Sequence, residues 1–577
     1  MAARLTTYVV VGIVAATLIA GLMVGAQRDD NDGPVDLIVF NGKVYTADGS
    51  SSMAEAVAVR GNQILRVGSN RDINRLRRPQ TVLVDALGAA VLPGFNDASA
   101  HFIDGGVALD AVDLREAATI EEVQTRIGAW AEAHPDRPWI VGGGWDNAAF
   151  AAGPTRQLLD AVVADRPACL LSRDGRAAWL NTKALRRAGI TRRTPAPAEG
   201  VIVKELRGGA PTGVLKGTAV ALATRIVPKT TRDDRARGLR AAIMEAHRNG
   251  VTSVQDIIAR PDDFLLYDDV RQAGDLSVRI YTSMNVDGVT ESEALKQIEA
   301  LTSQYPDDPI LKMGGARVTV DGPVESFGAA MLQPYNGNPE NVGPDRVDPD
   351  AFNRFVRLLD RRGWQLTAEA SGDRAVRIAL DAIEHAARSN AQPERGRRHR
   401  IEGVELVDAV DVPRFGRLGV IATIHPLFGN PTTERLDAWS DAVGAERASR
   451  AWPSGSIVSA RGKLAFGSGW PEVPLNPLAA IHTAVNRTTI DGLPEGGWND
   501  AERVSVRRAI NAFTSVPAYA SFDEQRKGTL KKGMLADLVV LSGDIFENPD
   551  AQIAGTTVAV TIFDGKIVYR RGATSTN

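Results

Sequence analysis

The sequence predicts an α/β fold in which a parallel (β/α)8 TIM-like barrel carries a small β-sandwich domain formed from both chain ends. Three observations predict it. Short apolar runs of β-like character alternate with longer helical patterns through the middle of the chain, as is typical of a parallel barrel. Eight such runs are present, which is the number that this barrel requires. The two chain ends carry strand patterns that resemble each other.

The predicted barrel strands leave room for helices between them. The run at residues 365–370, for example, lies between helical patterns at residues 350–362 and 374–388. This alternation makes successive strands parallel, because each helix returns the chain to the same edge of the sheet. The predicted strands are residues 91–97, 250–256, 278–284, 316–322, 365–370, 400–405, 420–425 and 464–469.

The chain ends predict a separate β domain. Residues 36–45 predict a hairpin with Asn41-Gly42 as its turn, and residues 56–68 predict a second hairpin. Residues 536–541 predict a strand, and residues 561–569 closely resemble the first hairpin. The expected segments are an anchor or signal segment (1–26), a linker (27–35), the β domain (36–89 and 525–577) and the barrel (90–524).

The N-terminal segment predicts an N-terminal transmembrane or signal helix. Residues 8–26 are uncharged, strongly apolar and long enough to cross a bilayer. Arg4 precedes them and three aspartates follow, so the positive-inside bias places the rest of the chain outside the membrane, in the periplasm or the extracellular space. Val24-Gly25-Ala26 also resembles a signal-peptidase site, and both an anchor and a cleaved signal remain open.

Composition limits the classes of partner and of site. The 577 residues carry a net charge of −3, which gives no reason to expect nucleic acid as a partner. Cys169 is the single cysteine, so no intrachain disulfide can form. Only seven histidines are present, which limits any histidine-based metal site. The oligomeric state is not determined by these features.

Residues 107–226 do not fit a single strand–helix unit. They contain extra strand-like runs at residues 139–141 and 168–171. We expect an insertion after the first barrel strand, folded over the open end of the barrel.

Polar residues follow the first predicted barrel strand. Asp97, Ser99 and His101 stand at a spacing of two, so their side chains lie on one face of an extended segment. Such a strand end is where a barrel enzyme builds its site.

This segment resembles the first strand of the metal-dependent amidohydrolase superfamily, in its amidohydrolase family 3 branch. The resemblance covers the whole chain after the linker. Further matching segments are Gly144-Trp145-Asp146, Pro154-Thr155-Arg156, Ser172-Arg173-Asp174-Gly175, Trp179-Leu180-Asn181 and Pro211-Thr212-Gly213-Val214-Leu215. The resemblance implies hydrolysis of carbon–nitrogen bonds by a metal-activated water. It also implies ligands from a first-strand His-x-His, a strand-four lysine, histidines on strands five and six, and a strand-eight aspartate.

The sequence departs from this implied ligand set. His101 is retained, and the other positions are Ser99, Arg317, Glu369, Gly403 and Gly469. A guanidinium stays protonated and cannot become a carbamate ligand, and glycine offers no side-chain donor. We therefore predict no metal centre and no cofactor, with a divalent metal such as zinc expected only if the alternative function below holds.

The exchanged residues suggest other interactions. We predict Arg317 within salt-bridge reach of Glu369 or Asp321, with the guanidinium standing where the metal would sit. His101, Glu369 and Asp373, with Asp97, form a candidate metal-free acid–base set. His425 has two interpretations: a structural histidine before a proline turn, which is favoured, and a residue that faces the mouth of the barrel.

A small-molecule site is expected at the open end of the barrel. Trp145 and Trp470 are candidates for stacking on an organic ligand, with core packing as the alternative for each. Arg173 and Arg176 are candidates for holding an anion. Arg317 and Asp321 complete the predicted ligand-binding set.

Two functions follow. The first is an exported, catalytically degenerate amidohydrolase, a pseudoenzyme that keeps a small-molecule binding or scaffolding role. The alternative is an active hydrolase that acts on carbon–nitrogen (non-peptide) bonds of a small organic substrate through a rearranged site.

Overall fold

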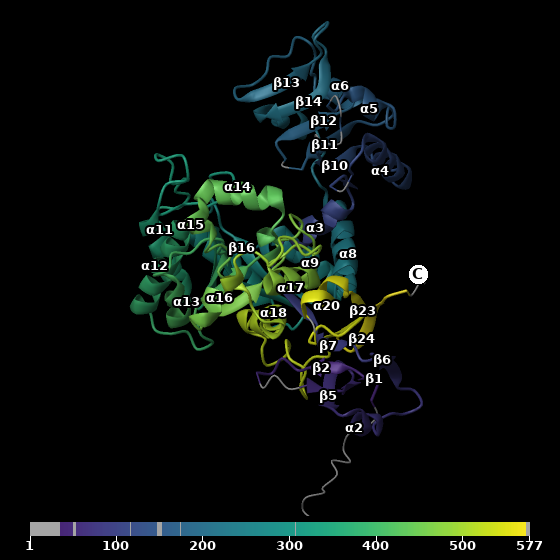
Figure 1. Ribbon diagram of the computed structural model, residues 1–577, viewed down its shortest axis with the longest axis vertical. Coiled ribbons are helices and arrows are strands. Elements are labelled where there is room, and N and C mark those ends of the chain that lie inside the picture. The colour runs from purple at the N-terminus through teal and green to yellow at the C-terminus, as the bar shows by residue number, and fades with distance from the viewer. Residues whose placement is uncertain are drawn as a thin grey trace, which may run out of the picture.

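The computed structural model describes residues 35–49, 53–115, 117–146, 150, 153–173, 175–305, 307–547 and 549–572. Its centre is a nearly closed barrel of eight parallel strands (Figure 1). Around the barrel the strands are β8 (Phe95–Ala100), β15 (Val251–Ala259), β16 (Arg279–Asn285), β17 (Leu311–Thr319), β18 (Gln365–Ala370), β19 (Arg400–Gly403), β20 (Ile421–Ile424) and β21 (Lys463–Phe466). Each of the eight predicted runs contributes one of these strands.

Hydrogen bonds between β8 and the residues just beyond the end of β21 bring the first and last strands together. The amide of Ser468 donates to Asp97 Oδ1 at 2.9 Å, and the amide of Gly469 donates to the Ser99 carbonyl at 2.8 Å. A Cβ on Gly467 would lie 2.6 Å from that of Ser99, so only glycine permits this approach.

Two strand predictions need correction. The predicted strand at residues 91–97 divides at Gly94 into β7 (Ala90–Pro93), which belongs to another sheet, and β8. The strand predicted at residues 316–322 begins instead at Leu311 and ends at Thr319. The sequence pattern missed the first half of this strand, because Gly314 and Gly315 lower its β propensity. Both lie where Tyr281 and Gln365 approach the backbone too closely for a Cβ.

Helices surround the barrel and begin at conventional caps. Thr231 and Asp234 form a capping box at the start of α8, and the Asp348 side chain accepts the Ala351 amide at the start of α11. The helices along the barrel are α3 (Phe102–Leu109), α8 (Arg232–Arg248), α9 (Pro261–Gln272), α10 (Glu291–Gln304), α11 (Pro349–Arg361), α12 (Asp373–Ser389), α13 (Val412–Leu418), α14 (Thr433–Val443), α15 (Ala445–Ala448), α16 (Ser454–Ser459), α17 (Pro477–Asn486), α18 (Val506–Ala512) and α19 (Ser515–Ala520). The short helix α7 (Ala221–Thr224) packs with the insertion instead.

Two small sheets lie beyond the N-terminal end of the barrel (Figure 1). The first has the order β5 (Gln63–Gly68), β4 (Ala56–Arg60), β1 (Leu37–Phe40) and β6 (Val82–Asp85), with α2 (Asn70–Asn74) beside it. The second has the order β24 (Lys566–Arg570), β23 (Val558–Phe563), β22 (Leu538–Leu541), β7, β2 (Lys43–Tyr45) and β3 (Met53–Ala54), and α20 is Pro549–Gly555. Both chain ends thus meet in one sheet.

The first predicted hairpin, at residues 36–45, is wrong, whereas the pairings at residues 56–68 and 561–569 are confirmed. β1 pairs with β4 and β6, and β2 pairs with β3 and β7, so the two strands separate into different sheets. The turn at Asn41-Gly42 is present, with Asn41 in the left-handed region at φ 55°. The chain uses it to pass from one sheet to the other.

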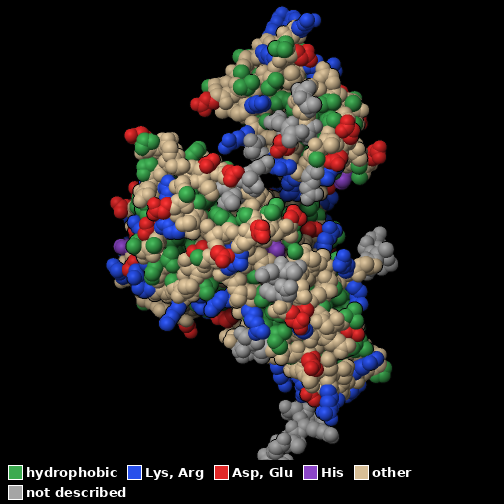
Figure 2. Space-filling model, in the orientation of Figure 1, with side chains coloured by type: hydrophobic (Ala, Val, Ile, Leu, Met, Phe, Trp, Pro, Cys, Tyr) green, Lys and Arg blue, Asp and Glu red, His purple; other side chains and the backbone are tan. Residues whose placement is uncertain are grey.

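The insertion forms its own sheet beside the barrel (Figure 1). Its order is β13 (Gly200–Lys204), β14 (Pro211–Gly217), β12 (Ala177–Leu180), β11 (Ala168–Ser172), β10 (Ile140–Trp145) and β9 (Val112–Asp113), with helices α4 (Ile120–Ala133), α5 (Arg156–Asp160) and α6 (Thr182–Arg187). It encloses hydrophobic clusters of its own. On the face drawn in Figure 2, acidic and basic side chains are interspersed over the barrel and the insertion.

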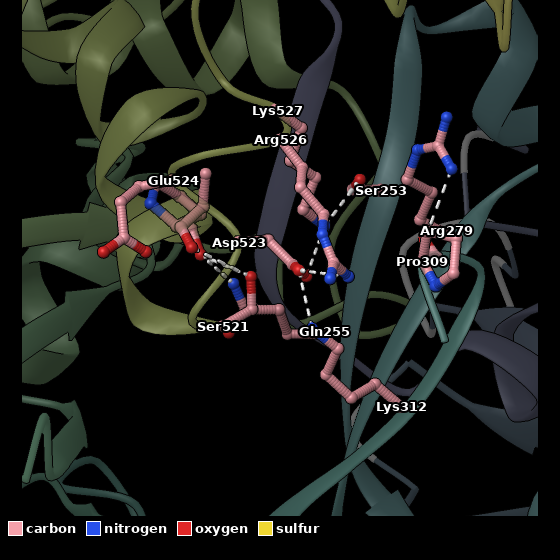
Figure 3. Close-up of polar contacts among 12 residues, drawn as sticks. Ser253, Gln255, Arg279, Pro309, Lys312, Ser521, Asp523, Glu524, Arg526 and Lys527 are labelled. Atoms are coloured by element: carbon pink, nitrogen blue, oxygen red, sulfur yellow. Dashed lines mark hydrogen bonds and ion pairs between the residues drawn. The ribbon is translucent and has the colours of Figure 1, made fainter. Parts of the chain in front are cut away.

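A buried polar cluster occupies the N-terminal ends of the barrel strands, and we call it the barrel floor: Ser253, Arg279, Lys312, Asp523 and Lys527. Asp523 accepts from Lys312 Nζ at 2.6 Å, and Lys527 Nζ donates to Ser253 Oγ at 3.0 Å (Figure 3). Nearby, Arg279 binds Asp537 of the second small sheet through two hydrogen bonds of 2.6 and 3.0 Å. These contacts attach the barrel to that sheet.

The predicted N-terminal membrane or signal segment lies outside the described residues. Within the part of the chain that the structure describes, no helix has the length and apolar character to cross a membrane.

Candidate functional site

A polar cavity of about 130 Å³ opens at the C-terminal ends of the barrel strands, and we call it the barrel mouth. Its walls come from the ends of strands β8, β18, β19 and β20 and from the loops that follow the strands. The lining residues are Ser99, His101, Gly322, Pro323, Glu325, Glu369, Ser371, Glu402, Gly403, Glu405, His425, Phe428, Gly469 and Glu472. This is the end at which barrel enzymes build their sites.

Ser99 and His425 face each other across the first and seventh strands of the barrel. Nε2 of His425 lies 2.7 Å from Oγ of Ser99, within hydrogen-bond distance. β20 ends at Ile424, so His425 is the residue that leaves the strand before the turn at η4 (Pro426–Gly429). Of the two interpretations of His425, the one that places it facing the mouth is confirmed, because its side chain lines the barrel mouth.

Both imidazoles of the barrel mouth are neutral at pH 7. Burial lowers the pKa of His101 to about 4, and the charge of Arg317 contributes to that shift. Burial lowers the pKa of His425 to about 3, with further contributions from His101, Arg400 and Arg317. A neutral imidazole keeps one unprotonated nitrogen, which can accept a proton.

The predicted Arg317–Glu369 ion pair is confirmed. Nη2 of Arg317 bonds to Oε2 of Glu369, and Nη1 donates to Oγ1 of Thr319 at 3.0 Å. The Arg317 side chain is 4% exposed and that of Glu369 is 37% exposed, so the pair reaches from the core to the cavity wall. Arg317 and Glu369 lie two positions out of register on β17 and β18, where Thr319 is opposite Glu369.

Asp321 acts differently from the prediction. Its carboxylate accepts the amides of Ser371 and Gly372 at 2.8 Å and that of Ala330 at 2.9 Å. Burial raises its pKa to about 7, against the opposing effect of these bonds. Asp321 therefore holds loops together below the cavity wall rather than pairing with Arg317.

A second buried pair, which the sequence analysis missed, lies on β19. Arg400 Nη2 donates to Oε1 of Glu402 at 2.7 Å, and the guanidinium also bonds to Gln255 and to the Ala98 carbonyl. Oε2 of Glu402 has no hydrogen-bond partner among the described residues. Burial raises the pKa of Glu402 to about 7, opposed by the charges of Arg400 and Arg317. The cavity wall thus contains one buried carboxyl oxygen that has no hydrogen-bond partner among the described residues.

Several predicted site residues lie away from the barrel mouth. Trp145 is buried in the insertion, where Nε1 donates to the Leu170 carbonyl at 2.9 Å. Arg173 bonds to the Arg115 carbonyl, and Arg176 is exposed on the insertion. Trp470 packs edge-on against Phe102, with ring centroids 5.9 Å apart. The core-packing alternative therefore describes both tryptophans.

Asp373 also lies outside the cavity. Its Oδ1 accepts the amide of Leu332 at 2.8 Å at the start of α12, and burial raises its pKa. The insertion, expected to fold over the open end of the barrel, contributes no described residue to the cavity wall. Of the predicted acid–base set, the structure brings only His101 and Glu369 into the barrel mouth.

The missed residues carried weak sequence signals. Glu402 lies opposite Glu369 in the β18–β19 register, a relation that only correct strand ends reveal. Glu325, Glu405 and Glu472 come from loops, whose paths the strand pattern does not predict.

The histidines and glutamates of the barrel mouth are not grouped as a metal centre requires. In the described ranges, no group of three or more His, Cys, Asp or Glu side chains is arranged to hold a metal ion. The hydroxyl of Ser99 is engaged with His425, and the guanidinium of Arg317 occupies the neighbourhood of Glu369.

Fold and site together define a (β/α)8 barrel protein of the hydrolase type, with a polar cavity at the C-terminal strand ends. The chain belongs to the amidohydrolase family, whose family 3 model matches residues 82–569. It is 30% identical to Protein LONG AFTER FAR-RED 3 of Arabidopsis thaliana over 92% of this chain and 91% of that protein. It is 27% identical to the N-substituted formamide deformylase of Arthrobacter pascens, over 93% and 98% of the two chains.

Solved structures show the same fold. An uncharacterized metal-dependent hydrolase from Pyrococcus horikoshii OT3 has a TM-score of 0.70 at 21% identity, covering 90% of this chain and 99% of its own. A similar hydrolase from Pyrococcus furiosus has a TM-score of 0.68 at 24% identity, covering 87% and 97%.

Proposed function

We propose that this chain is an exported amidohydrolase-family protein that has lost the family's metal-dependent hydrolysis and binds a small molecule at the barrel mouth. It is anchored through residues 8–26 or secreted after their removal, and nucleic acid is not its partner. The domain boundaries at residues 36–89, 90–524 and 525–577 belong to the same proposal.

The Arg317–Glu369 pair is the observation that carries this proposal. A guanidinium keeps its charge at any physiological pH, so a fixed cation stands beside the carboxylate that a metal would need. Its charge also lowers the pKa values of His101 and His425, and the same repulsion disfavours a divalent cation at their nitrogens. Gly403 and Gly469 contribute no donor side chain. The residues present therefore do not fit the family's metal centre.

Metal content tests this proposal directly. The full-length protein is purified without chelators, and its zinc, iron, manganese and nickel are quantified by elemental analysis. We expect much less than one ion per chain. A stoichiometric ion that is lost in His101→Ala would contradict the proposal.

A second candidate function is hydrolysis of a carbon–nitrogen bond through a rearranged, metal-free site. The hydrogen bond between Ser99 and His425 favours it, because a hydroxyl and a neutral imidazole at this distance form a nucleophile and its base. The deformylase of Arthrobacter pascens, named for N-substituted formamides, supports the choice of carbon–nitrogen bonds. Turnover of a small amide panel, measured with and without added metals, separates the two candidates.

A further inference from the structure

We propose that an arginine-rich surface around α2 docks on the anionic headgroups of the membrane into which residues 8–26 are proposed to insert. This inference rests on the proposed anchoring and deepens it, by naming the surface that meets the bilayer and the lipid charge that it recognises. We call this surface the α2 patch: Arg71, Arg75, Arg77 and Arg78. It lies at the end of the molecule opposite the insertion (Figure 1).

The four arginines of the α2 patch are exposed and carry little compensating charge. Asp72 is the only acidic residue in the segment from 69 to 82, and it contacts Arg75 at 3.4 Å between exposed groups. Arg71 and Arg77 form no ion pair with another residue that the structure describes. The chain as a whole has a net charge of −3, so attraction to an anionic surface is a property of this patch and not of general basicity. In Figure 2, basic side chains gather at this end of the molecule.

Packing of α2 directs its polar face outward. Ile73 lies in a buried cluster with Ile38 and Leu65, and Leu76 packs against the same cluster. Glu55, on a neighbouring segment, accepts the amide of Asn70 at 2.8 Å and forms no ion pair with an arginine of the patch. The helix therefore presents its arginines to solvent with a surplus of positive charge.

The first described residue of the chain lies directly beside the patch. The Thr81 hydroxyl donates to the Val35 carbonyl at 2.8 Å and accepts the Arg78 amide at 3.0 Å. Val35 also shares the buried cluster of Ile73. The eight residues from 27 to 34 separate Val35 from the apolar segment, and eight residues span at most about 30 Å when fully extended. An anchor at residues 8–26 therefore keeps the patch close to the bilayer surface.

The linker itself is the competing occupant of the patch, because it carries Asp29, Asp30 and Asp32. Arg28 offsets one of these charges, whereas the patch has four arginines against Asp72. A positive surplus therefore remains even where the linker charges face the patch. A basic residue close to an anionic bilayer strengthens binding about fivefold, and this attraction falls off within a Debye length of about 8 Å. The surplus thus favours direct contact with anionic headgroups.

A fluorescent label on α2 tests this contact in the full-length protein. Asn74 is exposed and the native Cys169 is buried, so a thiol-reactive fluorophore on Asn74→Cys reports on α2 alone. The protein is inserted into vesicles of phosphatidylcholine, or of phosphatidylcholine and phosphatidylglycerol in equal parts, that contain lipids with a nitroxide quencher on the headgroup. We expect quenching in the mixed vesicles and at least about fivefold less in phosphatidylcholine. A label on Ala196→Cys in the insertion is expected to stay unquenched in both.

Two triple variants with the same change in charge make the test specific. Replacing Arg71, Arg75 and Arg77 by glutamine is expected to reduce quenching in the mixed vesicles at least about fivefold. Replacing three exposed arginines of α11 by glutamine is expected to leave it unchanged; they are Arg354, Arg357 and Arg361, and none forms an ion pair with a described residue. Equal quenching in the two vesicle types, or unchanged quenching in the α2 variant, overturns the contact. Quenching that appears only after the three linker aspartates are replaced by asparagine assigns the patch to the linker and overturns it as well.

Flotation separates this inference from the proposed anchor. Flotation with phosphatidylcholine vesicles reports the anchor alone. A chain that floats only with the mixed vesicles, and no longer does so in the α2 variant, contradicts the anchor and leaves the patch standing. A chain that floats with both but shows no quenching on α2 overturns the patch and leaves the anchor standing, and one that floats with neither contradicts both.

Discussion

Both ends of the barrel place a buried serine hydroxyl beside a basic nitrogen, but only one of the two pairs borders a cavity. At the barrel mouth, Ser99 lies 2.7 Å from His425 in the wall of a cavity, and Ser99 itself is 0% exposed. At the barrel floor, Ser253 lies 3.0 Å from Lys527, and their exposed fractions are 2% and 5% (Figure 3).

The charged side chains at the two ends of the barrel differ in how fully they are buried and paired. At the floor, Arg279 is 2% exposed and its fork is matched by Asp537 and Asp564. At the mouth, Arg317 shares a carboxylate that is 37% exposed, and Glu402 keeps one oxygen without a partner among the described residues. The floor therefore stabilises the fold, whereas the mouth retains polar groups that a ligand can satisfy.

The largest expected effect comes from breaking the floor. Arg279→Met leaves Asp537 buried without its bidentate partner, so we expect a loss of about 3–5 kcal/mol in the free energy of unfolding. Chemical denaturation measures it. As a control, Arg75→Met removes an exposed ion pair with Asp72 and is expected to change nothing measurable. Equal stability of the two variants would contradict the structural role of the floor.

The next effect concerns the pH dependence of the mouth. The pKa of Glu402 is raised from 4.5 to about 7 in the folded protein, so its stabilising contribution is complete below pH 4.5 and is lost as pH rises to about 7. Relative to wild type, Glu402→Gln is expected to gain up to about 3 kcal/mol across this window. Denaturation at several pH values measures the difference. A difference that does not vary with pH would show that Glu402 ionises normally.

The floor is expected to respond to pH in the opposite sense. Burial lowers the pKa of Lys527 from 10.5 to about 8, so the unfolded chain binds more protons than the folded chain between these values. Wild-type stability should therefore rise between pH 8 and 10.5 relative to Lys527→Met, by an amount of up to about 3 kcal/mol. The same denaturation series, extended to alkaline pH, measures this rise in stability. Parallel curves of unfolding free energy against pH for the wild type and Lys527→Met would contradict the lowered pKa of Lys527.

The smallest stability effect is expected for Arg317→Met at the mouth, about 1 kcal/mol, because water screens the half-exposed Glu369. Its electrostatic effect is larger, since removing this cation should raise the pKa values of both His101 and His425. Histidine titration by NMR measures both. Arg362→Met, which removes a surface pair with Glu299, is the control. Unchanged histidine pKa values in Arg317→Met would contradict the electrostatic picture of the mouth.

The sequence predicted the barrel more fully than the site. Alternating apolar runs located all eight strands, because buried parallel strands have few other compositions available to them. The pattern was less reliable where glycine interrupted it, at Gly94 and at Gly314-Gly315. It also paired β1 with β2 through an ideal turn, although long-range pairing with β4 and β7 competes with a local hairpin and prevails.

Some contacts of the candidate site could be predicted from the sequence and others could not. The contact between Arg317 and Glu369 could be predicted, because neighbouring parallel strands place residues of similar depth together. The hydrogen bond between Ser99 and His425 could not, because 326 positions separate them in sequence and the barrel must nearly close before they meet. The predicted aromatic and arginine residues of the insertion lie away from the barrel mouth, and Trp145 is used by the insertion's own core.

By itself, the sequence determined which strands exist, their order, and which side chains end them, because periodicity and composition are local properties. Only the tertiary structure decided that Ser99 meets His425, that Glu402 is buried beside Arg400, and that the described residues of the insertion stand apart from the cavity. Those outcomes depend on how strand ends and loops converge, which is set by closure of the whole barrel rather than by any single segment.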